Sequence, residues 1–249
     1  MASHPIYQFY VELDGFQPKM WRRFQVMNHI KLSRLGYIVM VLYDMMASHL
    51  FSMDVNKGEN FIRHLKETVE GFNEAEFREL IPKLSQEKVS YQIPDFMQDM
   101  YDPTTTNENL FEAKLKEVIK YEGDEITLFY DFGDSWEVKI KLEKIILESS
   151  LPGNQLPRVL EGEGLGIIED IGGVGGLHEC VLAFKKRQGE DYTMYRDWLG
   201  VDDLDITFFD LEDMNFRVKK IPIIYEKIYE RQETLTKHAI SLLERDYDL

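Results

Sequence analysis

The stretch Tyr130–Glu137, which reads YDFGDSWE, constrains the fold more than any other part of the sequence. It joins two strand-like runs, Ile126–Asp131 and Ser135–Glu143, through aspartates and a glycine typical of a hairpin bend. Gly133 is expected to supply the positive φ, and the aspartates to accept hydrogen bonds from local amides. In the second run, apolar residues alternate with charged ones, which predicts one buried face, including Trp136, and one wet face.

The runs before this hairpin suit the same sheet. Ile6–Leu13 and Met20–Val26 are rich in aromatic and β-branched residues and are predicted to pair as neighbouring strands. Apolar residues in Leu32–Met46 recur at helical spacing, which predicts a helix packed on the sheet, and His49–Val55 alternates like a short strand. The fold class expected is therefore α+β, with a mixed, largely antiparallel sheet and helices packed against it.

A more polar section runs from residue 58 to about residue 107. Helical patterns in Phe61–Val69 and in Phe77–Ile81 predict that this section is a helical insertion. After it, Leu110–Ile119 is expected to be mostly helical, with a strand at Leu110–Ala113 as the alternative.

The second half of the chain is largely helical in pattern. Helices are predicted at Leu177–Lys186, at Tyr192–Leu199 and, as one long helix, at about Ile223–Glu244. We therefore expect one α+β domain over residues 1–215 and a C-terminal helical extension of the same domain over residues 216–249.

The net charge restricts the kinds of partner. Forty-five acidic against 29 basic residues give −16, which disfavours binding to nucleic-acid phosphates. The single cysteine, Cys180, cannot form an internal disulfide, and the first residues do not resemble a signal peptide. No run approaches the roughly 18 apolar residues of a membrane span. The expected location is the cytoplasm, with no membrane association.

Carboxylates near the hairpin bend are candidates for a functional cluster. Carboxylate oxygens are ligands of hard divalent cations, and a cation could bind where such groups converge. The candidates for that cluster are Asp131, Asp134, Glu137, Glu169 and Asp170, of which Asp131, Asp134, Glu169 and Asp170 would be the metal ligands. The alternative is that the aspartates only stabilise the turn.

Arg22, Arg23 and a glycine-rich segment complete the candidate surface. Seven of the 16 glycines lie between Gly162 and Gly176, and Gly172 and Gly173 follow the Glu169-Asp170 pair after one intervening residue, Ile171. On a strand the two arginines point to opposite faces, so at most one can reach the hairpin. It would either pair with an aspartate of the bend or, with amides that open the next helix, hold a small anionic ligand such as a phosphate or carboxylate.

Other reactive residues give weaker signals. The six histidines have no zinc-type spacing. His49 stands out among them because it ends a predicted helix beside a predicted strand, and a cap at the helix C-terminus is the alternative role that weighs at least as much. Cys180 lies in an apolar helical pattern and is expected in the core.

Several of these motifs, taken together, resemble the plasmid ORF-three-like family named from a root-inducing plasmid, which includes the TnpR-like passenger protein of an insertion element. The resemblance covers most of residues 6–215 in collinear order, and its motifs are WRRFQV at Trp21–Val26, HLFSM from His49, YDFGDSWE and the segment Pro157–Gly176. It implies an α+β fold and an association with mobile elements, and it supplies no agreed activity.

The chain departs from that family's pattern at three places. Val138 stands where members usually have a histidine after the Trp-Glu pair, and Gly36 where they have one early in the first helix. Gly166-Ile167-Ile168 replaces a Cys-Pro-Pro triplet. Chemistry that depends on those groups is not expected in this chain.

Three functions remain open from the sequence. The first is a non-enzymatic binding or accessory module whose hairpin and glycine loop bind a partner protein. The second is a metal-assisted phosphoryl or nucleotide enzyme that uses the acidic cluster, with an arginine as anion clamp. The third is a nucleic-acid-binding accessory protein, which requires a basic face that joins Arg22 or Arg23 with Lys185, Lys186 and Arg187.

Overall fold

The computed structural model of the protein describes residues 4–70, 72–73, 81–84, 86–94, 105–147 and 151–244. The strands are β1 (Ile6–Leu13), β2 (Trp21–Met27), β3 (Phe51–Asn56), β4 (Lys88–Gln92), β5 (Thr105–Asn109), β6 (Glu125–Tyr130), β7 (Trp136–Ile146) and β8 (Arg158–Glu163). The helices are α1 (Leu32–Leu42), α2 (Lys57–Thr68), α3 (Ile81–Leu84), α4 (Leu115–Val118), α5 (Gly173–Lys186), α6 (Glu190–Leu199), α7 (Leu211–Tyr229) and α8 (Lys237–Leu243).

One mixed sheet of eight strands forms the centre of the molecule, in the order β5-β4-β3-β6-β7-β1-β2-β8. Only the β4–β5 pair is parallel, and the other neighbours run antiparallel. The predicted α+β class with a mixed, largely antiparallel sheet is therefore confirmed. Within the described part of the chain, no helix combines the length and the apolar character needed to cross a membrane.

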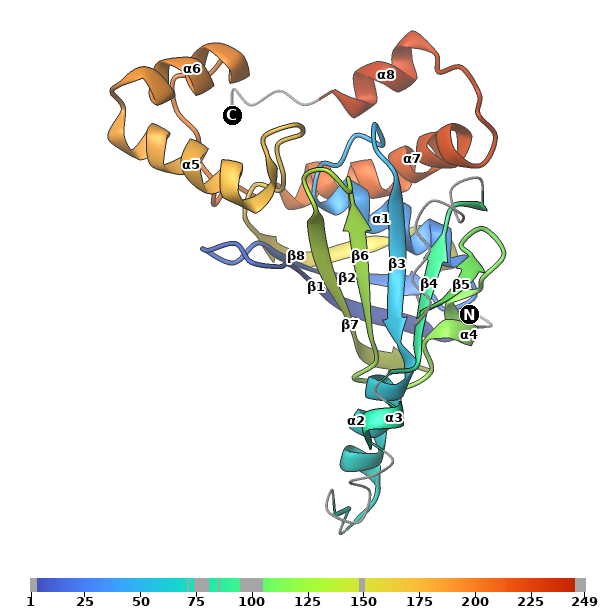
Figure 1. The fold of residues 1–249 in the computed structure, drawn as a ribbon. Coiled ribbons are helices and arrows are strands. Elements are labelled where there is room, and N and C mark those ends of the chain that lie inside the picture. Colours follow the sequence, from blue (N-terminus) through green and yellow to red (C-terminus); the bar gives the residue numbers. More distant parts are fainter. Residues whose placement is uncertain are drawn as a thin grey trace.

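The core lies between one face of the sheet and α1. Every residue of α1 except Arg34 is buried, because the curved sheet surrounds one side of the helix and α7 packs along another (Figure 1). On α7 the buried positions include Val218, Ile221 and Tyr225, which recur at helical spacing, and the Tyr225 ring lies edge-on to Tyr37 of α1. The opposite face of the sheet carries the polar members of each alternating strand.

The β6–β7 hairpin has the predicted alternation. Tyr130 pairs with Trp136 at the bend, and Trp136 is 0% exposed, which confirms the expectation that it lies in the core. In Figure 1 this bend lies at the same end of the sheet as α5, while α2 and α3 extend from the opposite end. The fold thus brings the hairpin bend beside the glycine-rich segment.

The polar section from residue 58 to residue 107 contributes to the sheet as well as to the helices. It contains α2 as expected, but β4 and most of β5 also belong to it and extend the sheet beyond β3. Lys88–Gln92, which pairs with β3, alternates between polar and apolar residues as a strand does, but this short pattern lies in a polar section whose other patterns are helical, so it was not recognised. Most of the second helical pattern, Phe77–Ile81, lies outside the described residues.

Two helix predictions are corrected. Only Leu115–Val118 of the expected Leu110–Ile119 helix is helical, and Leu110–Ala113 forms a turn held by the Asn109 side chain, whose carbonyl accepts from Phe111 N. The C-terminal helix is two helices. The first begins at Leu211 with Asp210 as its cap and contains Pro222, and the second begins after the capping residue Thr236. The expected boundary at residue 216 falls inside α7.

Candidate metal site

The segment that joins α1 to β3 forms one wall of the candidate site. Asp44 and Ala47 have positive φ, 56° and 59°, so the chain turns twice before it reaches His49. From α7, the Tyr225 hydroxyl donates to the Met45 carbonyl and the Tyr229 hydroxyl donates to the His49 carbonyl. These contacts hold the backbone on either side of the turn, so α7 fixes the position of the His49 imidazole.

The β6–β7 bend forms a second wall. Asp131 and Ser135, not Gly133, have the positive φ, 53° and 55°, which corrects the expectation for this turn. The Asp131 Oδ1 atom accepts from Gly133 N at 3.0 Å, and the Asp131 carbonyl accepts from Ser135 N at 2.6 Å. Aspartate tolerates the left-handed conformation because its side chain makes such a local hydrogen bond. Asp131 Oδ2 is left to face His49.

The glycine-rich segment before α5 supplies the third wall. Gly173 has a φ of 68°, and an added Cβ would overlap the Asp134 carbonyl, so only glycine allows this close approach to the hairpin. Asp134 Oδ2 accepts from Gly172 N at 3.0 Å. The hairpin and the glycine-rich segment are therefore in direct contact. This contact places Glu169 and Asp170 next to the bend.

Four side chains from these three walls converge. His49 Nε2 lies 3.2 Å from an Asp170 oxygen, 3.6 Å from Asp131 Oδ2 and 3.7 Å from Glu169 Oε2. The ligand atoms of His49, Asp131 and Asp170 all lie within 4.8 Å of one another. Asp131 and Glu169 are largely buried, whereas the Asp170 side chain is 74% exposed. The cluster is closed on the protein side and open to solvent at Asp170.

The spacing suits one shared metal ion. Bonds of about 2.0 to 2.2 Å to nitrogen and oxygen place two ligand atoms of a tetrahedral ion about 3.3 to 3.6 Å apart. The three separations around His49 Nε2 lie within a few tenths of an ångström of that range. Side-chain rotations would bring the ligand atoms of His49, Asp131 and Asp170, which lie within 4.8 Å of one another, into bonding distance of a single ion, and Glu169 lies beside them.

The hydrogen bonds within the cluster are incomplete. His49 Nε2 and Glu169 Oε2 are buried atoms that make no hydrogen bond in the described part of the chain, although they lie close together. The other oxygen of Glu169 accepts from Met46 N at 2.5 Å and from the Tyr130 hydroxyl at 2.7 Å. Burial raises the pKa of Glu169, and these two hydrogen bonds oppose that rise. The unsatisfied atoms face the centre of the cluster, where a cation would satisfy both.

The remaining carboxylates of the expected set lie outside the cluster. Asp134 is used in the contact with Gly172, and Glu137 lies on the outer face of β7, where it pairs with Lys139 at 3.2 Å. Of the five carboxylates proposed from the sequence, the structure brings together Asp131, Glu169 and Asp170.

Arg22 does not reach this cluster. It is 0% exposed, and its guanidinium lies over the rings of Tyr43 and Phe209. Its hydrogen bonds go to four backbone carbonyls, those of Trp21, Leu42, Glu163 and Gly164. Arg22 thus ties β2 to the end of α1 and to the end of β8, which is a structural role.

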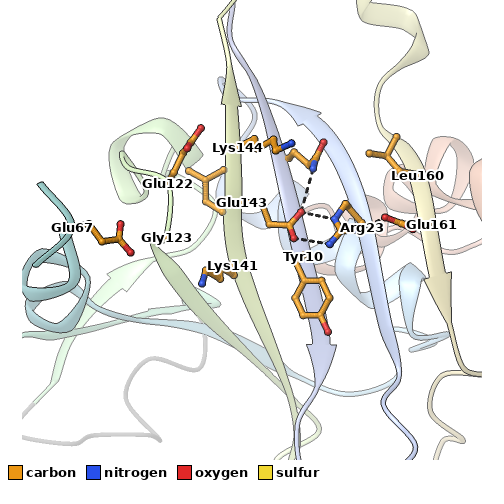
Figure 2. Close-up of a pocket in the computed structure, with 12 residues that line it drawn as sticks. Tyr10, Arg23, Glu67, Glu122, Gly123, Lys141, Glu143, Lys144, Leu160 and Glu161 are labelled. Atoms are coloured by element: carbon orange, nitrogen blue, oxygen red, sulfur yellow. Dashed lines mark hydrogen bonds and ion pairs between the residues drawn. The ribbon is translucent and has the colours of Figure 1, made fainter.

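Arg23 points to the opposite, outer face of the sheet, as the strand alternation requires. Figure 2 shows its guanidinium against Glu143 and Glu161 in a shallow groove that also contains Tyr10. The Glu143 contacts are 2.5 Å and 2.8 Å, and they hold the pKa of Glu143 below its ordinary value. The expectation that one arginine pairs with the hairpin bend is therefore wrong, because both are used within the sheet.

His49 is the residue of the site that the sequence interpretation missed. Its position between a helix and a strand was noted, with a cap at the helix C-terminus as the alternative role. That alternative is wrong, because α1 ends at Leu42 and His49 lies in the segment that follows. The available signal was its presence in HLFSM, immediately before a strand that neighbours the YDFGDSWE hairpin. A lone histidine whose partners are more than 80 residues away has no recognisable ligand spacing.

Comparisons with known proteins agree with the fold and give no activity. The chain is 33% identical over 86 residues to "Uncharacterized protein y4hQ" of Sinorhizobium fredii, a match that covers 34% of this chain and 43% of that protein. A solved structure of a protein of unknown function, MM3350 from Methanosarcina mazei Go1, has a TM-score of 0.60 and 25% identity, and covers 84% of this chain and 97% of the other. The chain spans less than half of y4hQ. The model of the plasmid pRiA4b ORF-3-like proteins matches residues 5–217, so this chain belongs to that family.

Proposed function

We propose that the protein is a binding module built around a divalent transition-metal site. The ligands are His49, Asp131 and Asp170, with Glu169 as the fourth group. The observation that carries the proposal is the convergence of the three ligand atoms within 4.8 Å, from three segments far apart in the sequence. It is also supported by two buried atoms of the cluster that make no hydrogen bond in the described part of the chain, His49 Nε2 and Glu169 Oε2.

The kind of ligand narrows the choice of metal. An imidazole nitrogen beside carboxylates suits zinc, iron, cobalt or nickel, whereas calcium and magnesium prefer oxygen ligands alone. Three carboxylates around one imidazole also leave excess negative charge, which a divalent cation offsets. This sharpens the cation site expected from the sequence, because a histidine replaces Asp134 among the ligands.

A binding role has more support than phosphoryl transfer. Such enzymes use cationic side chains to hold the phosphate, and the two arginines considered for that task point into the core and to the outer face of the sheet. Nucleic-acid binding has little support too, since Arg23 and Arg187 are each paired with carboxylates. The second candidate is metal-assisted hydrolysis, which is favoured by the exposure of Asp170, because the open side of the cluster leaves room for water or substrate.

The association with mobile elements belongs to the same proposal and is supported by membership of a family named after a plasmid reading frame. A cytoplasmic location is supported by the single cysteine, Cys180, which is buried and free. In this setting the metal site would stabilise the surface formed by the hairpin bend and the glycine-rich segment, to which a partner protein would bind.

Metal affinity should depend on the cluster and on no other carboxylate of the hairpin. We expect isothermal titration with Zn²⁺ and Co²⁺ to show one site in the wild type. His49→Gln or Asp131→Asn should weaken binding by more than about a hundredfold, because even outer-shell changes cost 10- to 100-fold. Glu137→Gln, in the same hairpin but on the outer face, is the matched control and should bind as the wild type does.

Equal affinity in His49→Gln, Asp131→Asn and the wild type would show that the metal binds elsewhere. Hydrolysis is tested separately with bis(p-nitrophenyl) phosphate and p-nitrophenyl phosphate on the zinc-loaded protein. Turnover that disappears in His49→Gln would favour the hydrolytic role, while metal binding without turnover of either compound would favour the binding module.

A further inference from the structure

A second polar site lies on the outer face of the sheet. A cavity of about 210 Å³ opens across β3, β4, β5 and β6. It is lined by Ser52, Asp54, Ser90, Gln92, Thr105, Asn107, Phe129 and Phe132. None of the four metal-site residues lines it, although Phe132 directly follows Asp131 in the hairpin bend. The two sites therefore lie on either side of the same bend.

The polar side chains of this cavity form a network with acceptors left over. The hydroxyls of Ser90 and Ser52 donate to Asp54 Oδ1 at 2.6 Å and 3.4 Å. The Gln92 amide donates to Ser90 Oγ at 3.2 Å and to Asn107 Oδ1 at 3.4 Å. Gln92 is 6% exposed, and its Oε1 is buried with no hydrogen-bond partner among the described residues. The Ser52, Ser90 and Gln92 donors are thus used within the network, and Gln92 Oε1 remains as an acceptor.

Asp54 gives the cavity a negative charge, and the burial of this charge destabilises the folded protein. Burial raises the pKa of Asp54, and the nearby charge of Glu137 raises it further, while Lys88 and the two serine hydroxyls act in the opposite direction. A carboxylate that is poorly solvated in the folded protein is typical of a functional position. A ligand that donates hydrogen bonds to Asp54 would compensate for its desolvation.

Two aromatic rings set the shape of the ligand. Phe129 projects from β6 and Phe132 from the bend, and the Phe132 side chain remains partly exposed, 39% for the residue. Flat, polarisable groups pack well against such rings. The volume lies below the roughly 300 Å³ at which sites for drug-sized ligands begin, so it fits one ring system or one terminal group.

We propose that this cavity binds a planar group that carries adjacent N–H donors, held by Asp54 and Gln92 and packed against Phe129 and Phe132. Guanine and guanidinium share this chemistry, because each presents neighbouring N–H groups that match a carboxylate. The ligand is thus a guanine nucleoside or a small guanidinium compound. This site does not depend on the proposed metal site, since the two share no side chain.

The test is titration of the intact protein with four probes, two donors and two matched controls. Guanosine is compared with adenosine, and methylguanidine with methylammonium, in metal-free buffer. Binding is measured from the NMR chemical shifts of the backbone amides of β3 and β6. We expect saturable shifts with guanosine or methylguanidine and at least tenfold weaker binding of the matched control. Asp54→Asn and, separately, Phe132→Ala should each weaken the preferred probe at least tenfold.

The preferred probe identifies the source of the donor group, a nucleoside or a guanidinium compound. The proposal would be overturned if a donor probe and its control bound equally well, or if no probe bound. It would also be overturned if both Asp54→Asn and Phe132→Ala bound the preferred probe as the wild type does. Because His49→Gln leaves this cavity intact, it should bind the probe as the wild type does. Loss of metal binding and loss of probe binding are therefore distinguishable outcomes.

Asp54→Asn should also be more stable than the wild type at neutral pH, which keeps the binding test free of unfolding. The pKa of Asp54 is higher in the folded than in the unfolded chain, so wild-type stability is greatest below the unfolded pKa and falls as pH rises through the folded pKa. Asparagine retains an acceptor for Ser90 and does not titrate. We expect the difference in melting temperature to grow from acid to neutral pH. A variant less stable than the wild type at pH 7 would contradict this.

Discussion

Replacement of Arg22 by alanine is expected to lower the free energy of unfolding by at least about 3 kcal/mol, because several buried carbonyls lose their donor and each unsatisfied group costs about 1 to 3 kcal/mol. The guanidinium is fully buried and donates to four backbone carbonyls from β2, α1 and the end of β8. The space between Tyr43 and Phe209 would also be left empty. Urea denaturation followed by circular dichroism measures the effect.

Arg23→Ala is the matched control, since it removes the same side chain from the adjacent position. Arg23 is partly exposed and its partners are surface glutamates, so its pairs are each worth at most about 1 kcal/mol. A loss in Arg22→Ala no greater than in Arg23→Ala would show that the buried carbonyls find other donors, and would contradict the structural role assigned to Arg22.

Trp136→Ala is expected to destabilise the protein by about 3 to 5 kcal/mol, the usual effect of removing a fully buried large aromatic side chain. Trp136 is 0% exposed at the first position of β7, opposite Tyr130, whose hydroxyl donates to Glu169. The cavity left behind therefore adjoins the strand pair that supports the metal site. A thermal melt combined with urea denaturation gives the change.

Trp198→Ala serves as its control, because Trp198 is 50% exposed on α6. Its removal should change stability by well under 1 kcal/mol, as is usual for surface substitutions. Equal effects at the two tryptophans would contradict the assignment of YDFGDSWE as a hairpin with Trp136 in the core.

The parts of the fold predicted correctly are those fixed by local pattern. Aromatic and β-branched content identified β1 and β2, alternation identified β3 and the β6–β7 hairpin, and helical spacing identified α1, α5 and α6. These signals need only a few neighbouring residues. The sequence interpretation missed β4, Lys88–Gln92, although its residues alternate between polar and apolar, because the pattern is short and lies in a polar section whose other patterns are helical. The start of α7 was placed too late, at about Ile223 instead of Leu211, because Pro222 reads as a helix boundary in the sequence but lies inside the helix.

The candidate site could be predicted only in part. Asp131, Glu169 and Asp170 were among five carboxylates considered as a cluster, with turn stabilisation as the alternative for the aspartates. The choice between Asp131 and Asp134 as ligand depends on the turn geometry, since the positive φ at Asp131 leaves one of its oxygens facing the cluster. His49 lies at the site only because β3, the strand that follows it, is the neighbour of β6 in the sheet. The hydrophobic periodicity of a sequence does not predict which strands become neighbours in a sheet.

Anomalous diffraction from crystals grown with Zn²⁺, recorded at the zinc absorption edge, tests the central claim most directly. We expect one strong peak between the three walls of the site, bonded to His49 Nε2 and to oxygens of Asp131 and Asp170 at about 2.0 to 2.2 Å. A map without a peak there, in which His49 is hydrogen-bonded directly to Asp170, would contradict the proposed metal site and leave the cluster as an imidazole-carboxylate network.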